Sequence, residues 1–159
     1  MNFRERQVEI VSVTTRPNEG WMLQVGRNLI DSDAGALSDK RFLIIDRDTQ
    51  YTAQFRRLID DAGTQVIRLP PMSPNLNAYA ERFVRSIKHE CLDRMIFVGQ
   101  ASLRRAITEY IKHYHGERNH QGLDNRLIRP CARDTANDAH IRRRQRPGGM
   151  LNFYHRLAA

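Results

Sequence analysis

Two short apolar runs separated by an amphipathic stretch place the strongest constraint on the fold of this chain. The first run, "RFLIID", and the second, "TQVIRL", have the pattern of strands, and the first has the apolar content of a strand covered on both faces. Between them, "TAQFRRLIDDAG" predicts a helix that ends at Gly63 and places Phe55, Leu58, Ile59 and Ala62 on one face. This alternation predicts an α/β layer architecture.

The flanking segments predict further elements. Residues 6–15, "RQVEIVSVTT", are rich in β-branched residues and predict a strand, and Asn18 is suited to cap a helix that follows it. The prolines of "PPMSPN" predict a loop. Two helices are expected over 75–95 and 102–115. The core face predicted for the first comprises Leu76, Ala80, Phe83, Ile87 and Cys91, and that for the second comprises Leu103, Ala106, Ile107, Tyr110, Ile111 and Tyr114.

The positive charge of the chain is concentrated in its C-terminal part. The net charge is +8, and residues 101–159 contribute +7 of it, with 12 Lys and Arg against 5 Asp and Glu. Such asymmetry favours a polyanionic partner, above all nucleic acid, although a tail that serves solubility is the alternative. We expect two parts, residues 1–125 and a basic arm over 126–159, for which a hairpin around "RPGG" is one conformation.

Cysteine content and hydropathy indicate the compartment. Cys91 and Cys131 are too few for a disulfide framework, so we expect a reducing, cytoplasmic setting. No apolar run approaches the length that crosses a membrane, so no membrane partner is expected.

Two acidic residues stand out by position. Asp46 follows an apolar strand directly, and an ion pair with Arg47 is the ordinary explanation for it. Glu81 lies away from the core face of its predicted helix, with Arg85 and Lys88 four and seven positions later on the same side. A solvated face with a Glu81–Arg85 pair is the ordinary explanation there.

Three segments taken together resemble the catalytic core of the DDE integrases and transposases. They are "IIDRDTQYT", "SPNLNAYAERFVRSIKHECLDR" and "YHGERNHQGL", and the nearest similarity is to transposases of bacterial insertion sequences. The resemblance implies an RNase H-like fold, in which a mixed sheet is flanked by helices. It places the second family acid on Asp46 and the third on Glu81, which are 81 − 46 = 35 positions apart.

The resemblance implies hydrolysis and transfer of DNA phosphodiesters with two Mg²⁺ or Mn²⁺ ions held by acidic residues. Asp46 and Glu81 would be metal ligands, and Arg85 and Lys88 would hold DNA phosphates. Arg118 and His120 would brace the fold or touch phosphate. The basic arm, through Arg142, Arg143, Arg144 and Arg146, would contact DNA. A zinc site at His113, His115 and His120 is the weaker alternative, because no cysteine pair accompanies these histidines.

The chain departs from the family pattern at its beginning. No acid in residues 1–40 corresponds to the first family acid, so we expect the first two strands of the fold to be missing and the chain alone to be inactive. A gene remnant and a start codon placed too late are the two explanations. Association with a full-length transposase or with further copies of the chain would follow from exposed sheet edges.

Two other functions remain open at this point. One is a non-catalytic DNA-binding or subunit-interaction protein that regulates a full-length transposase. The other is an RNase H-like nuclease acting on RNA–DNA hybrids, which shares the expected fold but not the "NAYAE" helix.

Overall fold

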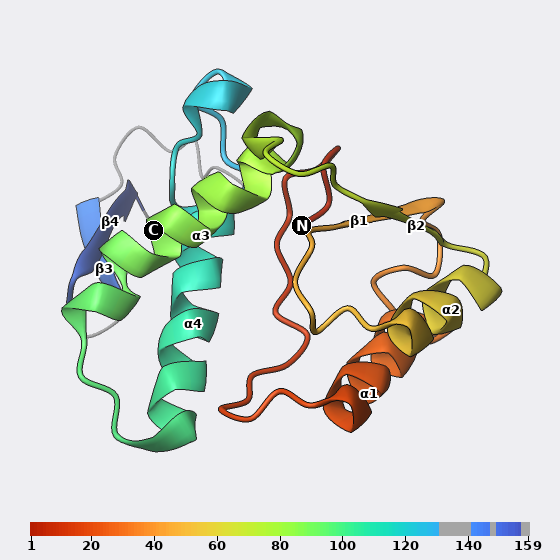
Figure 1. Ribbon diagram of the computed structural model, residues 1–159. Helices are drawn as coiled ribbons and strands as arrows, with labels where there is room; N and C mark the ends of the chain where they lie inside the picture. The colour runs from red at the N-terminus through yellow and green to blue at the C-terminus, as the bar shows by residue number, and fades with distance from the viewer. Residues whose placement is uncertain (131–140, 147–148, 157–159) are drawn as a thin grey trace. The chain divides into compact units, whose positions relative to one another are not determined.

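The computed structural model describes residues 1–130, 141–146 and 149–156. The chain divides into two compact units, which we describe separately. The βαβ unit comprises Glu9–Ala78, and the helix–hairpin unit comprises Met1–Val8 together with Tyr79–Ala159 (Figure 1). The boundary expected at residue 125 stays a prediction.

The βαβ unit contains two helices and a parallel pair of strands. Its elements are α1 (Glu19–Leu29), β1 (Phe42–Ile45), α2 (Ala53–Asp61) and β2 (Gln65–Arg68), followed by the 3₁₀ turn η1 (Pro74–Asn77). β1 pairs with β2 in parallel, from Phe42 opposite Gln65 to Ile45 opposite Arg68. The predicted strand, helix and strand of this region are therefore confirmed.

Local signals fix the ends of both helices in this unit. The side chain of Asn18 accepts a hydrogen bond from Trp21 N at 2.8 Å, and that of Thr52 accepts one from Phe55 N at 3.3 Å. Past the end of α2, Gly63 has φ +90°, a left-handed conformation that glycine adopts without strain. The core of the unit consists of Met22, Leu37, Phe55 and Ile59.

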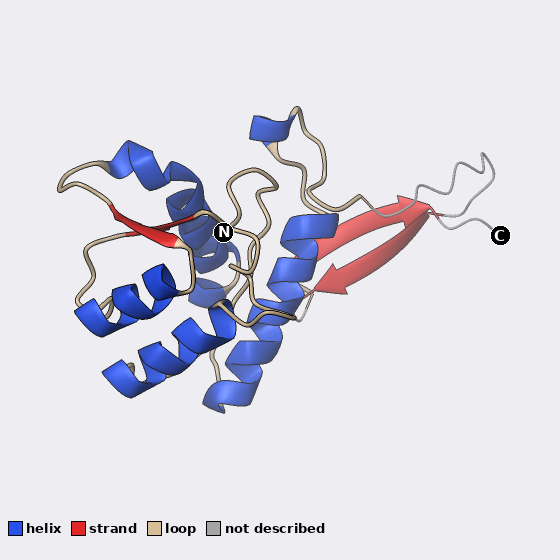
Figure 2. Cartoon of the chain, turned by 90° about the vertical axis from the view of Figure 1, so that its right-hand side faces the viewer, coloured by secondary structure: helices blue, strands red, loops and turns tan. Residues whose placement is uncertain are grey.

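The helix–hairpin unit has two long helices and an antiparallel hairpin. Its elements are α3 (Ala78–Glu90), η2 (Leu92–Arg94), α4 (Gly99–Gly116), η3 (Gln121–Leu123), β3 (Ile141–Arg146) and β4 (Leu151–Arg156). β3 pairs with β4, with Arg143 opposite Tyr154 and Arg146 opposite Leu151. Figure 2 shows the two strands of the hairpin side by side, next to the helices of this unit.

Aromatic side chains dominate the core between α3 and α4. The buried set is Val8, Phe83, Ile87, Cys91, Ala106, Tyr110 and Tyr114. The ring centroid of Phe83 lies 5.0 Å from that of Tyr114 in an edge-to-face arrangement, which favours the ring quadrupoles. The predicted core stripe of α4 is confirmed except at Leu103, which is half-buried and does not belong to this core. On α3, Phe83, Ile87 and Cys91 are buried as predicted, whereas Leu76 precedes the helix in η1 and is 53% exposed.

Three predictions about local structure are wrong. Residues 6–15 form no strand, because a strand needs a hydrogen-bonded neighbour and none of the described segments pairs with them. β1 is not covered on both faces, since Phe42 is 48% exposed and only Ile45 is buried. The helix expected over 75–95 is shorter, because 3₁₀ turns replace its first and last turns.

The described residues thus combine helices with two small sheets, a mixed helix-and-strand architecture. Among them, no helix has both the length and the apolar character needed to cross a membrane.

Candidate functional site

Asp46 stands at the carboxyl end of β1, in a loop that its own side chain helps to shape. Its Oδ1 accepts a hydrogen bond from Asp48 N at 2.9 Å, and Oδ1 of Asp48 accepts one from Gln50 N at 2.9 Å. Such bonds from aspartate to a backbone two positions later are turn-forming. The carboxylate of Asp46 is exposed, so the loop presents an acid to solvent at the end of a parallel strand.

Arg47 does not neutralise Asp46. Its Nε donates instead to the carbonyl oxygen of Leu69 at 3.0 Å, which fastens the loop after β1 to the end of β2. No described residue forms an ion pair with Asp46, so the ordinary explanation of a surface pair is wrong. Burial, with the nearby charges of Asp46 and Asp48, raises the pKa of Tyr51. The charges of both aspartates are therefore felt at Tyr51, next to the loop.

Glu81 lies in the first turn of α3, with its side chain exposed. Arg85 and Lys88 follow on the same helix, and both are exposed as well. The pair expected as the ordinary explanation does not form, because no Glu81–Arg85 ion pair occurs within 4.0 Å in the part of the chain that the structure describes. α3 therefore presents an acid at its start, where the helix dipole favours a negative charge, and two unpaired cations further along.

The predicted acids belong to different units, Asp46 to the βαβ unit and Glu81 to the helix–hairpin unit. Within either unit, the described residues contain no group of three or more His, Cys, Asp or Glu side chains arranged to hold a metal. Asp46 and Glu81 nevertheless suit a hard cation such as Mg²⁺, since both are exposed carboxylates that form no ion pair with a described residue.

Arg118 and His120 are engaged inside the helix–hairpin unit. Arg118 forms an ion pair with Glu90 at 2.8 Å and donates to the hydroxyl of Tyr110 at 3.2 Å. Nε2 of His120 lies 2.7 Å from the carbonyl oxygen of Tyr114, to which it donates. Both residues thus brace the end of α4, which is one of the two roles predicted for them.

The remaining histidines of the "HYHGERNHQG" segment also have internal partners. His113 Nδ1 lies 3.2 Å from Oε2 of Glu117, and His115 Nε2 accepts a hydrogen bond from Val8 N at 2.9 Å. Burial lowers the pKa of His115, with the charge of Arg129 as a further cause. These bonds give the histidines a structural explanation that needs no zinc.

The arginines of the basic arm divide into two groups. Arg146 forms ion pairs with Glu109 and Glu117, and Arg144 forms one with Glu117 at 3.2 Å. Arg142 and Arg143 are exposed and form no ion pair with a described residue. Two of the four arm arginines therefore attach the hairpin to Glu109 in α4 and to Glu117 directly after it.

The sequence analysis missed the role of Glu117. Its side chain is 4% exposed, and its carboxylate contacts the side chains of Arg144, Arg146 and His113. Burial raises the pKa of Glu117, but hydrogen bonds from these three residues outweigh burial and hold the pKa below its usual value. The only sequence signal was a lone acid in a segment rich in His and Arg, and nothing in it pointed to partners 27 and 29 positions away.

Comparison with known families identifies the segment that carries Glu81. Residues 62–127 match the integrase core domain family, which supports the DDE integrase and transposase catalytic core that the sequence resembles. The resemblance found in the sequence is confirmed, and the family implies an RNase H-like fold, with which the mixed helix-and-strand structure is consistent. Glu81, Arg85, Lys88, Arg118 and His120 lie inside the matched residues, and Asp46 lies outside them.

No match was found among curated proteins or among solved structures.

Proposed function

We propose that this chain acts in cutting and joining DNA phosphodiesters with divalent metal ions, as part of the transposase of a bacterial mobile element. The observation that carries the proposal is the integrase core match over residues 62–127, within which Glu81 is exposed and forms no ion pair with any residue that the structure describes. A divalent ion bound at Glu81 would reverse the repulsion between this carboxylate and a DNA phosphate.

Asp46 and Glu81 would hold Mg²⁺ or Mn²⁺, with two ions in a complete site. When bound, such ions activate the attacking oxygen and stabilise the leaving one. The chain itself contributes position: the Asx turns and the Arg47 bond fix the loop of Asp46, and packing of Phe83 and Ile87 fixes the helix of Glu81. Each acid is thus held in place within its own unit, which lowers the cost of ordering it for a ligand.

Arg85 and Lys88 would hold DNA phosphates next to Glu81, because they follow it along α3 and their charges are not neutralised internally. Arg142 and Arg143 would make further phosphate contacts from the hairpin. We propose that Arg118, His120, Arg144 and Arg146 serve mainly to hold the scaffold, as their internal partners support.

We further propose that the 159-residue polypeptide alone joins DNA ends poorly, because it supplies two of the three acids that the DDE reaction requires. Its activity would then depend on a further carboxylate from a full-length transposase or another copy. The test is a strand-transfer assay in Mg²⁺ or Mn²⁺ with the purified chain, alone and mixed with a full-length transposase of the same element.

The expected result is no joining by the chain alone, and joining in the mixture that falls at least tenfold with Glu81→Gln or Asp46→Asn. Joining by the chain alone at rates typical of complete enzymes would contradict the need for a third acid. Equal activity of the wild-type and Glu81→Gln mixtures would contradict the role of Glu81.

A second function is favoured by the concentration of charge in residues 101–159 and by the exposed Arg142 and Arg143. In it, the chain binds DNA and transposase subunits without catalysis and thereby regulates a full-length transposase. DNA binding that survives Asp46→Ala and Glu81→Ala, together with inhibition rather than support of the full-length enzyme, would favour this second function.

A further inference from the structure

The β3–β4 hairpin has two chemically different faces. Side chains alternate along a strand, so Arg144 and Arg146 share one face with their cross-strand neighbours Phe153 and Leu151. This inner face is the one that contacts the rest of the unit, because Arg144 and Arg146 bind Glu117 and Leu151 packs against the α3–α4 core.

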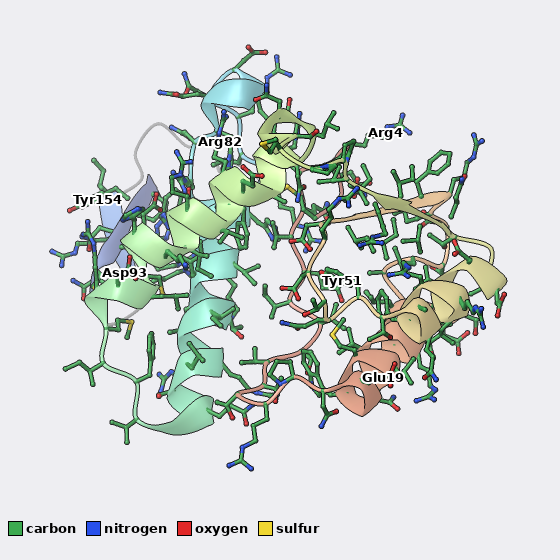
Figure 3. The ribbon with its side chains drawn as sticks, viewed as in Figure 1. Arg4, Glu19, Tyr51, Arg82, Asp93 and Tyr154 are labelled. Carbon is green, nitrogen blue, oxygen red and sulfur yellow. The ribbon has the colours of Figure 1, made fainter. Side chains whose placement is uncertain are left out.

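The outer face carries Arg143 opposite Tyr154 and Gln145 opposite Asn152. All four residues are exposed, and Tyr154 is 62% exposed. Figure 3 shows Tyr154 at the edge of its unit, on the hairpin and beyond α4. The ring of Tyr154 is therefore accessible to a ligand, on the same face as Arg143.

The Arg143 guanidinium is held on this outer face and keeps its charge. With the Gln145 amide oriented so that its oxygen faces Arg143, that oxygen accepts a hydrogen bond from Arg143 Nε at 3.1 Å. No described acid pairs with Arg143, and residues 141–156 contain no Asp or Glu at all. On the inner face, Arg144 and Arg146 are neutralised by Glu109 and Glu117, whereas Arg142 on the same face and Arg143 on the outer face form no ion pair with a described residue. The outer face is the one that places such a cation opposite an exposed aromatic ring, that of Tyr154.

We propose that this outer face binds a single-stranded stretch of DNA, with an unpaired base stacked on Tyr154 and a backbone phosphate held by Arg143. Charge complementarity selects a polyanion, and the exposed ring beside a cation selects a strand whose bases are free to stack. Gln145 and Asn152 add amide donors and acceptors to the same surface. The inference deepens the proposed function, since it rests on DNA as the partner of the chain.

The test is fluorescence anisotropy with a labelled oligothymidylate and with a blunt duplex of equal length, using the full chain. Tyr154→Ala is expected to weaken binding of the single strand about fivefold or more, the effect of removing one stacked base, and to change duplex binding less than twofold. Arg143→Ala should weaken both ligands and reduce the slope of log K against log salt concentration for the single strand by about 0.7, one phosphate contact.

Matched variants separate stacking from sheet stability. Tyr154→Phe keeps a ring and should bind like wild type, whereas Tyr154→Val keeps a β-branched strand former without a ring and should bind as weakly as Tyr154→Ala. Arg57→Ala removes an exposed arginine of α2 and should leave the affinity for the single strand unchanged. Photocrosslinking of wild type to an oligonucleotide with 5-iodouracil, which reacts with stacked aromatic rings, should yield an adduct on Tyr154.

Tyr154→Ala binding within twofold of wild type, or crosslinks that all map outside residues 141–156, would overturn this inference and leave the proposed function standing. A wild-type chain that binds neither the single strand nor the duplex would overturn both.

Discussion

The backbone N–H of Val8 donates a hydrogen bond to Nε2 of His115 over 2.9 Å, although the two residues are 107 positions apart in the sequence. The bond is buried, and Val8 lies in the same core as Tyr110 and Tyr114. It ties the first eight residues to the end of α4. Because Nε2 accepts this bond, His115 must be neutral in the folded protein.

The first prediction concerns pH. The pKa of His115 lies below its usual 6.5 in the folded chain, and burial also lowers that of His120. Below pH 6.5 the unfolded chain therefore binds protons that the folded chain does not, and stability is lost as the pH falls from 6.5 through the lowered values. Urea unfolding between pH 7.5 and 5 should show this loss.

The free energy of unfolding should fall less steeply with decreasing pH in His115→Gln, because this substitution removes one of the two histidines with a lowered pKa. A stability that rises as the pH falls below 6.5 would contradict the assignment of His115 as a neutral acceptor.

The second prediction concerns the hydroxyl of Tyr110, which is fully buried. It donates to Oε2 of Glu90 at 3.0 Å and accepts from Arg118 at 3.2 Å, so Tyr110→Phe leaves both charged groups with an unmet bond. We expect a loss of about 1–3 kcal/mol in the free energy of unfolding. Tyr154→Phe, at a hydroxyl on the exposed outer face, should change it by less than about 0.5 kcal/mol. Equal effects of the two substitutions would contradict the network.

The third prediction concerns the attachment of the hairpin. Glu117→Gln removes the charge that receives Arg144 and Arg146, and breaking one partner of a buried pair costs up to about 3–5 kcal/mol. Hydrogen exchange should accelerate in β3 and β4 at least tenfold more than in α3. Because the pKa of Glu117 is below its usual 4.5, wild type should keep this attachment above pH 4.5 and lose it as the pH falls further. Hydrogen exchange that accelerates equally over the whole unit in Glu117→Gln would contradict a local role of Glu117 in attaching the hairpin.

The fourth prediction separates the candidate site from the scaffold. Asp46 and Glu81 are exposed and form no ion pair with a described residue, so Asp46→Asn and Glu81→Gln should each change the free energy of unfolding by less than about 0.5 kcal/mol. Thermal unfolding of the two variants and of wild type, without divalent ions, checks this. A loss above 2 kcal/mol in either variant would indicate a structural carboxylate rather than one reserved for a ligand.

Elements defined by local signals were predictable from the sequence. The cap at Asn18, the stop at Gly63 and the apolar stripe of α4 each depend on a few neighbouring residues, and each is present. The strand expected over 6–15 failed because β-branched residues favour an extended backbone but cannot supply a neighbouring strand.

In the candidate site, too, features that depend on neighbouring residues were predictable and those that depend on tertiary contacts were not. Exposure of Glu81, Arg85 and Lys88 follows from the helical period and was predictable. The partners of Arg144 and Arg146 were not, because an ion pair between residues 27 or more positions apart depends on how the hairpin packs against α4. The run of arginines in the sequence suggested DNA contacts for both residues. In the folded chain both form ion pairs with Glu117.

The central proposal is that Asp46 and Glu81, the two acids that match the family pattern, are ligands of the same divalent ions. The most direct measurement is a titration of the ¹⁵N-labelled chain with Mn²⁺, which broadens amide signals near the bound ion. We predict broadening at residues around both Asp46 and Glu81, competed by excess Mg²⁺ and reduced at both places by Glu81→Gln alone. Broadening around one acid that is indifferent to substitution of the other, or broadening at neither, would contradict the claim.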